Sequence, residues 1–222
     1  MKNHQKITIV AFGDSITEAG HQALHDRWPA LLNRLLRDRF AGLDIEVINA
    51  GVGGNTSREG LRRIDTDVLQ HRPDFVTVEF GNDGTWENDR RVCLEEFVAN
   101  FDLIKVKIAA ASGGRLIVLP FTPVIDQWHP FHEKEFFKQQ GGMDAFGEQY
   151  RKVTRDFAHS RGLPLADVDL ALRREMAVTG PESCILPDGV HLTATGNRIL
   201  AETVCAVLTR EIEKFLTTQP LA

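Results

Sequence analysis

Short runs rich in Val, Ile and Phe alternate along this chain with longer segments whose apolar residues recur at helical spacing. Most of these runs stop at Gly or Pro, and they show little strict alternation of apolar and polar residues. Strands of this composition are buried on both faces, as in a parallel sheet covered by helices on each side. The sequence therefore predicts an α/β fold with strands at residues 7–12, 45–50, 75–80, 116–119 and 163–168.

Apolar residues spaced three and four apart predict helices between these strands, each with one face that can pack on the sheet. We expect these residues to belong to the hydrophobic core, because aromatic and aliphatic stripes of this kind are usually buried. The stripes are Trp28, Leu31, Leu32, Leu35 and Leu36; Leu61, Ile64 and Val68; Phe97, Phe101, Ile104 and Ile108; Met143, Phe146, Tyr150, Val153 and Phe157; and Ile199, Leu200, Val204, Val207, Leu208 and Ile212.

The size, charge and cysteine content of the chain indicate how many domains it has and which kinds of partner it lacks. A length of 222 residues with 42% hydrophobic residues fits one domain, residues 1–222, with a well-buried core. The formal net charge is −5, and no basic cluster indicates a nucleic-acid partner. Cys93, Cys184 and Cys205 are an odd number without paired metal-ligand spacing, which is typical of a reduced compartment.

The N-terminal sequence predicts neither export nor membrane insertion. The apolar run of seven residues from Ile7 is too short for the hydrophobic region and cleavage site of a signal peptide, and far below membrane-spanning length. We therefore expect a cytoplasmic protein without a membrane span.

Residues 122–142 interrupt the alternation with a connection well above the typical length. The segment contains Trp128, Phe131, Phe136 and Phe137, and it ends in a Gly-Gly pair. This composition suits a lid or a wall of a substrate site, but also a surface segment packed over the edge of the sheet.

A G-D-S motif at residues 13–15 follows the first predicted strand directly. In an open parallel sheet, ligands bind at the carboxyl ends of the strands, so the position favours function. Ser15 is then a candidate nucleophile, although a serine after a strand can also simply cap the next helix.

Asp188 and His191 lie three residues apart, just before the last predicted helix. A serine hydroxyl becomes a good nucleophile when an imidazole takes its proton and a carboxylate orients that imidazole. Asp188 and His191 supply these two groups, whereas alone they also fit a helix cap and a surface histidine.

Hydrogen-bond donors follow two further strands. Residues 49–56, which include Gly51, Gly53 and Gly54, lie after the second strand and match neither dinucleotide-binding nor phosphate-loop spacing. Asn82 follows the third strand, where its amide can donate to an oxyanion.

Together these motifs resemble the SGNH hydrolases, also called the GDSL esterase and lipase family, which four such blocks in this order define. The blocks span residues 13–191 and comprise the G-D-S motif, a Gly-Asn-Thr block after an Asn-x-Gly turn, a Gly-Asn-Asp block and the Asp-x-x-His block. Asn55 stands where the family frequently has Asp, and the pair Gly53-Gly54 leaves the corresponding glycine open by one position. We prefer Gly54, because it directly precedes the Asn-Thr pair.

The resemblance implies a three-layer α/β/α sandwich with a five-stranded parallel sheet of flavodoxin-like order. It implies Ser15 as nucleophile, His191 as general base and Asp188 as the residue that orients the imidazole. The oxyanion hole would combine the backbone N–H groups of Ser15 and Gly54 with the side-chain amide of Asn82. The expected activity is hydrolysis of carboxylic esters through an acyl-enzyme, without a cofactor.

Other residues offer rival chemistry. Cys184 would have to fold back on its own loop to serve as a nucleophile for His191. A catalytic metal is disfavoured, because the histidines with ligand-like spacing lie away from the predicted strand ends. These are His21 and His25 beside Asp26, and His129 and His132 followed by Glu133 and Glu135.

The substrate and the assembly state stay open at this point. Small or short-chain esters such as acetylated carbohydrates are the leading class, and lysophospholipids or acyl thioesters are the alternative within the family. A homologue that binds a ligand without cleaving it is the alternative of another class. The aromatic segment at residues 122–142 could also be an interface in a homo-oligomer.

Overall fold

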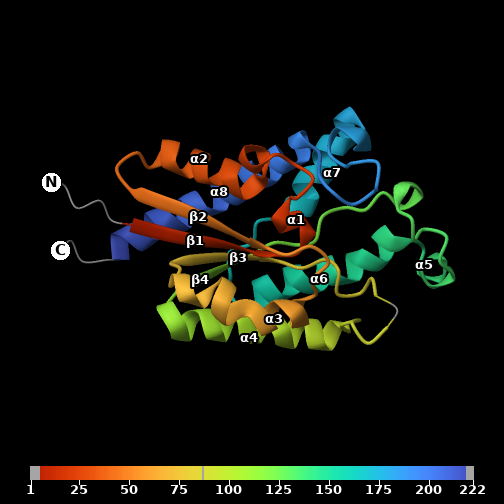
Figure 1. Ribbon diagram of the computed structural model, residues 1–222, viewed down its shortest axis with the longest axis horizontal. Coiled ribbons are helices and arrows are strands. Elements are labelled where there is room, and N and C mark those ends of the chain that lie inside the picture. The colour runs from red at the N-terminus through yellow and green to blue at the C-terminus, as the bar shows by residue number, and fades with distance from the viewer. Residues whose placement is uncertain (1–5, 87, 219–222) are drawn as a thin grey trace.

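The centre of the computed structural model, which describes residues 6–86 and 88–218, is a parallel β-sheet (Figure 1). Every strand pairing is parallel, with β1 between β2 and β3. The strands are β1 (Lys6–Gly13), β2 (Asp44–Gly51), β3 (Phe75–Glu79) and β4 (Arg115–Val118), in the order β2-β1-β3-β4. These four predicted strands are confirmed to within one residue at each end.

The sheet has four strands rather than the predicted five. At residues 163–168 only one parallel bridge forms, between Val118 and Leu165. Pro164 has no N–H to donate, and Asp167 already caps the next helix by accepting a hydrogen bond from the Leu170 N–H. The segment therefore runs where a fifth strand would lie, but the chain turns into a helix before a ladder can form.

Two helical layers cover the sheet, as the three-layer prediction requires (Figure 1). One layer contains α2 (Trp28–Arg39), α7 (Val168–Thr179) and α8 (Ala194–Thr218), and the other contains α3 (Ser57–Asp67), α4 (Leu94–Ser112) and α6 (Met143–Ser160). The remaining helical pieces are short: α1 (Ser15–Glu18), α5 (Glu135–Gln139), η1 (Leu24–Asp26), η2 (Leu69–His71), η3 (Asp126–Trp128) and η4 (Pro181–Ser183).

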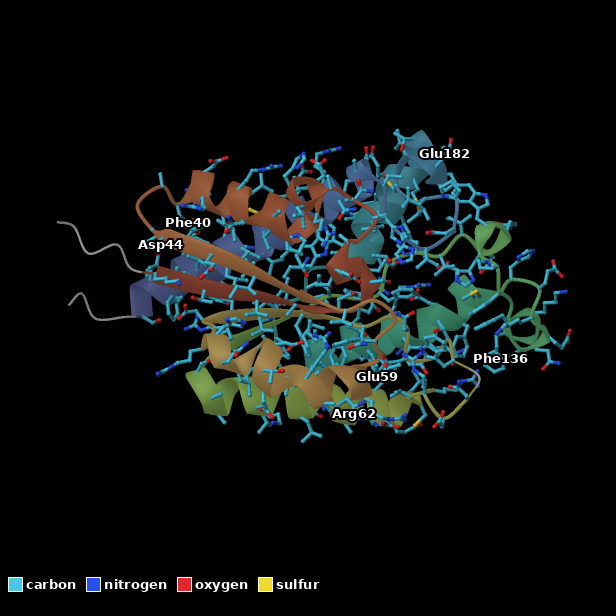
Figure 2. All side chains as sticks on the ribbon, viewed as in Figure 1. Phe40, Asp44, Glu59, Arg62, Phe136 and Glu182 are labelled. Atoms are coloured by element: carbon cyan, nitrogen blue, oxygen red, sulfur yellow. The ribbon has the colours of Figure 1, made fainter. Side chains whose placement is uncertain are left out.

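The predicted stripes pack against the sheet. Charged side chains such as Asp44, Arg62 and Glu182 lie on the outer surface instead (Figure 2). The stripe residues buried in the core are Trp28, Leu32, Leu36, Ile64, Val68, Phe97, Phe101, Ile104, Ile108, Met143, Phe146, Tyr150, Phe157, Leu200, Val204, Val207, Leu208 and Ile212. The core prediction is confirmed for these positions.

The strand order sets the place of the site. The chain moves from β1 outward to β2 and then returns past β1 to β3, so the connections leave the carboxyl ends of β1 and β3 in opposite directions. A crevice opens at such a switch point, and ligands of open α/β sheets bind there. Gly13 at the end of β1 is the register partner of Glu79 at the end of β3, which brings Ser15 and Asn82 into the same region.

Asn197, on α8, links this helix to the first residue of α2. Its Oδ1 accepts a hydrogen bond from the Trp28 N–H at 3.0 Å, and its Nδ2 donates to the carbonyls of Leu192 and Thr193 at 3.3 and 3.0 Å. Because Leu192 follows His191 directly, this buried amide also supports the turn that carries the histidine.

Replacing Asn197 with Ala should therefore lower the free energy of unfolding by about 2–3 kcal/mol, since buried backbone groups lose their partners. Urea denaturation followed by circular dichroism measures this loss. Glu202→Ala is a matched control, because Glu202 is exposed on the same helix, and its effect should stay within about 0.5 kcal/mol. Equal unfolding free energies for the two variants would contradict the role of Asn197.

Candidate active site

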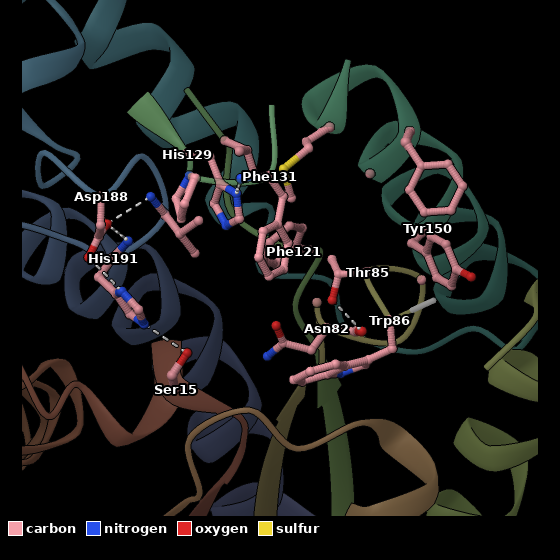
Figure 3. Close-up of a pocket in the computed structure, with 18 residues that line it drawn as sticks. Ser15, Asn82, Thr85, Trp86, Phe121, His129, Phe131, Tyr150, Asp188 and His191 are labelled. Atoms are coloured by element: carbon pink, nitrogen blue, oxygen red, sulfur yellow. Dashed lines mark hydrogen bonds and ion pairs between the residues drawn. The ribbon is translucent and has the colours of Figure 1, made fainter. Parts of the chain in front are cut away.

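Ser15, His191 and Asp188 form one hydrogen-bonded chain (Figure 3). The distance from His191 Nε2 to Ser15 Oγ is 3.0 Å, and the distance from His191 Nδ1 to Asp188 Oδ2 is 2.8 Å. The serine is 176 residues from the histidine in sequence. The structure thus brings together the three residues that the sequence singled out, in the order hydroxyl, imidazole, carboxylate.

The turn before α8 holds the imidazole and its carboxylate in place. Asp188 Oδ1 accepts hydrogen bonds from the N–H groups of Val190 and His191 at 3.0 and 2.9 Å. Burial alone would raise the pKa of Asp188, but these bonds and the contact with the His191 ring outweigh it and lower the pKa. The carboxylate is therefore ionised and oriented toward Nδ1 of His191.

Gly189 joins this turn to the segment 122–142 by a backbone hydrogen bond and close packing. Its φ is +78°, which favours glycine, and its carbonyl accepts a hydrogen bond from the Ile125 N–H at 2.8 Å. A Cβ at Gly189 would lie 2.6 Å from the Ile125 carbonyl oxygen, so the close approach also requires glycine.

Asp14 links the serine to the loop after β3. Its carboxylate accepts hydrogen bonds from the Ile16 N–H, the Gly81 N–H and the Asn82 side-chain amide, each at 2.9 Å. The Asn82 amide has a second hydrogen, and Asn82 lines the same pocket as Ser15 (Figure 3). Asp14 therefore fixes the orientation of Asn82 relative to the turn that carries Ser15.

The two glycines after β2 differ in their hydrogen bonding. The Gly53 N–H donates to Glu18 Oε2 at 2.8 Å, whereas no hydrogen bond from the Gly54 N–H forms within the described part of the chain. Gly54 has a φ of +72°, and a Cβ there would lie 3.9 Å from the Trp86 ring. This pattern favours Gly54 over Gly53 as the free donor.

Asp83 forms the buried support behind Asn82. It accepts hydrogen bonds from the N–H and the hydroxyl of Ser57, and Asn100 donates to that hydroxyl at 2.9 Å. Burial raises the pKa of Asp83 to about 7, although the Ser57 bonds act against the shift. The loop after β3 is thereby attached to the N-terminus of α3.

A pocket of about 240 Å³ opens beside Ser15 and His191 (Figure 3). Its walls come from the loop after β3, from the segment 122–142 and from α6, and they are mostly apolar. The apolar lining residues are Trp86, Phe121, Val124, Pro130, Phe131, Met143, Phe146 and Val190, with Tyr150 beside them. The arrangement can hold an apolar group next to a serine hydroxyl.

His129 is a polar group in the wall of this pocket. Its Nδ1 accepts a hydrogen bond from the Phe131 N–H at 3.0 Å, so the proton of the neutral ring is on Nε2. Burial lowers the pKa of His129, which keeps the ring neutral. The ring is then a hydrogen-bond donor in an otherwise apolar wall.

Several lining residues were not recognised as functional from the sequence. Met143, Phe146 and Tyr150 were expected only in the core, and they also line the pocket. A buried stripe and a pocket wall have the same helical spacing, so periodicity does not separate them. Trp86 follows the turn at residues 83–85 and belongs to no periodic pattern in the sequence. The Arg90 guanidinium lies over its ring, 3.8 Å from the centroid.

The rival residues do not assemble a separate site. His25 pairs with Asp26 at 3.3 Å, and His132 pairs with Glu133 at 2.9 Å, both near the surface. Cys184 is buried, and burial raises the pKa of its thiol. Among the described residues, the one group of three close ligand atoms is His21, Asp188 and His191, and its last two members are already paired with each other.

The fold and this constellation define the class of serine-dependent hydrolases with an open parallel sheet. The family model of the GDSL-like lipase/acylhydrolase family matches residues 11–199. The chain belongs to this family, and it is a GDSL-type esterase or acylhydrolase.

Individual relatives resemble the chain over most of its length. It is 25% identical to an acetylxylan esterase of Geobacillus stearothermophilus over 209 residues, covering 87% of this chain and 90% of the relative. It is 27% identical to the uncharacterized lipoprotein YqeF of Bacillus subtilis, covering 87% and 86%. The crystal structure of LAE5, an α/β hydrolase from the metagenome of Lake Arreo in Spain, superposes with a TM-score of 0.75 at 27% identity, covering 93% and 96%.

Over residues 6–86 and 88–218, no helix is both long and apolar enough to cross a bilayer. The cytoplasmic location stays a prediction.

The buried carboxyl of Asp83 should make stability depend on pH. Its folded pKa of about 7 lies above the usual value of 3.8, so the folded state holds the proton more tightly than the unfolded state. The unfolding free energy then falls as pH rises between these two values. Asp83→Asn should reduce that fall by about 2–4 kcal/mol, measured by urea denaturation across this pH interval.

Asp65→Asn is the control, because Asp65 is an exposed acid of the neighbouring α3, and its profile should run parallel to that of the wild type. A profile of Asp83→Asn parallel to the wild type would contradict the raised pKa.

Proposed function

We propose that this protein hydrolyses carboxylic esters through a covalent acyl-enzyme, with Ser15 as nucleophile, His191 as general base and Asp188 as the orienting carboxylate. The observation that carries the proposal is the chain of hydrogen bonds from Ser15 Oγ through His191 to Asp188 at the mouth of an apolar pocket. A serine, an imidazole and a carboxylate bonded in this order activate the hydroxyl for attack on an acyl carbon.

In the first step Ser15 Oγ attacks the ester carbonyl and His191 Nε2 takes the hydroxyl proton. Asp188 stabilises the imidazolium that forms. The negative oxygen of the tetrahedral intermediate accepts hydrogen bonds from the N–H groups of Ser15 and Gly54 and from the Asn82 amide. Because the Gly53 N–H already donates to Glu18, we assign the backbone donor of the oxyanion hole to Gly54 rather than to Gly53.

The tetrahedral intermediate then collapses. His191 gives its proton to the leaving alcohol, which departs and leaves the acyl group on Ser15. A water molecule then attacks the acyl-enzyme while His191 takes its proton. When the bond from the acyl carbon to Ser15 Oγ breaks, His191 returns this proton to Oγ and the acid is released. Every proton passes through one imidazole, so these steps need no cofactor.

The pocket supports short esters as substrates. Its volume of about 240 Å³ exceeds that of an apolar cavity of roughly 150 Å³ that accepts benzene, so an acyl or aryl group of modest size fits. We propose that residues 122–142 act as a substrate wall, because Val124, His129, Pro130 and Phe131 line the pocket. The similarity to an acetylxylan esterase supports acetylated carbohydrates as the substrate class.

A second candidate is hydrolysis of lysophospholipids or acyl thioesters. The apolar lining favours it, since the walls offer more apolar contact than an acetyl group uses. The same triad would perform both reactions, so the two candidates differ only in the acyl and leaving groups.

Hydrolysis of p-nitrophenyl esters of increasing acyl length should separate these cases. The wild type should be active, Ser15→Ala should lose activity by at least about 10³-fold, and the rate should fall for long acyl chains. Ser160→Ala is the control, because Ser160 is exposed at the end of α6, and it should match the wild type. Preference for long chains would favour the second candidate. Binding of the esters without Ser15-dependent turnover would indicate a non-catalytic homologue.

Replacing Asn82 with Ala should lower kcat by about 10²- to 10³-fold with little change in KM, because the amide acts on the transition state. Steady-state kinetics on the preferred ester measures the effect. The matched control is Asn88→Ala, since Asn88 is exposed on the same loop, and it should change kcat by less than about threefold. A similarly small change for Asn82→Ala would remove Asn82 from the oxyanion hole.

A further inference from the structure

A buried carboxyl group lies beneath the site and takes no part in the chemistry described above. Glu79 is the last residue of β3, and it is only 1% exposed. Its Oε2 accepts one long hydrogen bond, from the Thr17 hydroxyl at 3.4 Å, and no group in residues 6–86 and 88–218 donates to its Oε1. An ionised carboxylate in this position would be nearly unsolvated, which costs several kcal/mol.

The strand register brings a second acid next to Glu79, because Gly13, which directly precedes Asp14, is the register partner of Glu79. The side chain of Asp14, fully buried, is hydrogen-bonded to that of Glu79. A hydrogen bond between two carboxyl groups needs a proton on one of them, and two buried carboxylates in contact do not both ionise. The pair therefore shares a single proton.

The surrounding donors decide which acid keeps that proton. Asp14 accepts three hydrogen bonds, from the N–H groups of Ile16 and Gly81 and from the Asn82 amide, and these stabilise its ionised form. Among the described residues, Glu79 accepts a hydrogen bond from the Thr17 hydroxyl alone. Burial, and next the charge of Asp14, raises the pKa of Glu79 well above its usual range. The proton is therefore on Glu79, and its O–H donates to Asp14.

We propose that Glu79 is a positioning residue: as a neutral acid it donates a hydrogen bond to Asp14 and so holds the Asn82 amide and the Ser15 turn in their catalytic arrangement. The inference rests on the proposed function, because it assigns Glu79 a part in the same oxyanion hole. Glu79 acts through Asp14 and touches neither the substrate nor Ser15.

The charged groups around the pair define its pH response. Asp83, on the loop after β3, is the other acid that acts on Glu79, and His191 acts on Asp14. From α3, the Arg63 guanidinium donates to the Gly13 carbonyl at 2.7 Å and to Asp67 at 2.9 Å, so its bonds lie elsewhere. The Thr17 hydroxyl of α1 is neutral. Within the described residues, no cation bonded to the pair offsets a second negative charge.

Loss of the Glu79 proton at alkaline pH should therefore disrupt the site. Two adjacent carboxylates would repel each other, and Asp14 would release Asn82 or the Ser15 turn. The active form is the protonated one, so turnover is present below the pKa of Glu79 and is lost above it. This produces an alkaline limb in the pH profile of kcat.

Two substitutions at this position test the proposal. In Glu79→Gln the side-chain amide still donates to Asp14 but does not ionise, so kcat near neutral pH should stay within about threefold of the wild type and the alkaline limb should disappear. In Glu79→Leu the donor is lost, and kcat should fall by about 10- to 100-fold at nearly unchanged KM. Asp83→Asn separates the two buried acids: the alkaline limb should remain in that variant but move to lower pH, because one of the charges that raise the pKa of Glu79 is lost.

A second readout does not depend on turnover. Infrared difference spectra between the wild type and Glu79→Gln at mildly alkaline pH should show the carbonyl band of a protonated carboxyl group. Absence of that band, an alkaline limb retained in Glu79→Gln, or full activity of Glu79→Leu would each overturn the proposal. Loss of Ser15-dependent hydrolysis in the wild type itself would instead refute the proposed function, and the infrared band would still test the shared proton.

Discussion

The carboxylate of Asp14 is the interaction on which the site depends. It is fully buried, and it joins the backbone next to Ser15 to the backbone and side chain of the loop after β3. A buried carboxylate is stable only when donors surround it, so the two loops must keep their relative positions for the charge to be tolerated. The same requirement that stabilises the charge orients Asn82 toward the serine.

The strand order brings Asp14 and Asn82 together. β1 and β3 are neighbours in the sheet although β2 lies between them in the sequence, and their carboxyl ends carry Asp14 and Asn82. His191 arrives from the turn before α8, which Asn197 attaches to α2. Three segments that are remote in sequence thus meet at one edge, and each is held by a buried polar side chain rather than by apolar contacts alone.

Secondary structure was predicted correctly from the sequence where a single requirement, such as burial of both strand faces, decided the local conformation. The strands at residues 7–12 and 75–80 are predictable because burial on both faces demands continuous apolar residues. The segment at residues 163–168 has a similar composition, but Pro164 and the cap residue Asp167 override it. Ser15, Asp188 and His191 were singled out because the proposed chemistry restricts both the type and the order of its residues, and the structure places the three in one hydrogen-bonded chain. Glu79 was missed, although a single acid at the end of a buried strand is a signal that could have been used.

The α/β class, four of the strands, the core stripes and the motifs that carry Ser15, Asn82, Asp188 and His191 were predictable from the amino-acid sequence. These follow from periodicity and residue chemistry, which are local properties. The packing of remote segments was needed to show that Met143, Phe146 and Tyr150 line a pocket, that no described group accepts the Gly54 N–H, and that Asp14 and Glu79 are in contact. Such features depend on distances between segments, and a buried side chain has the same pattern in the sequence whether it faces the core or a cavity.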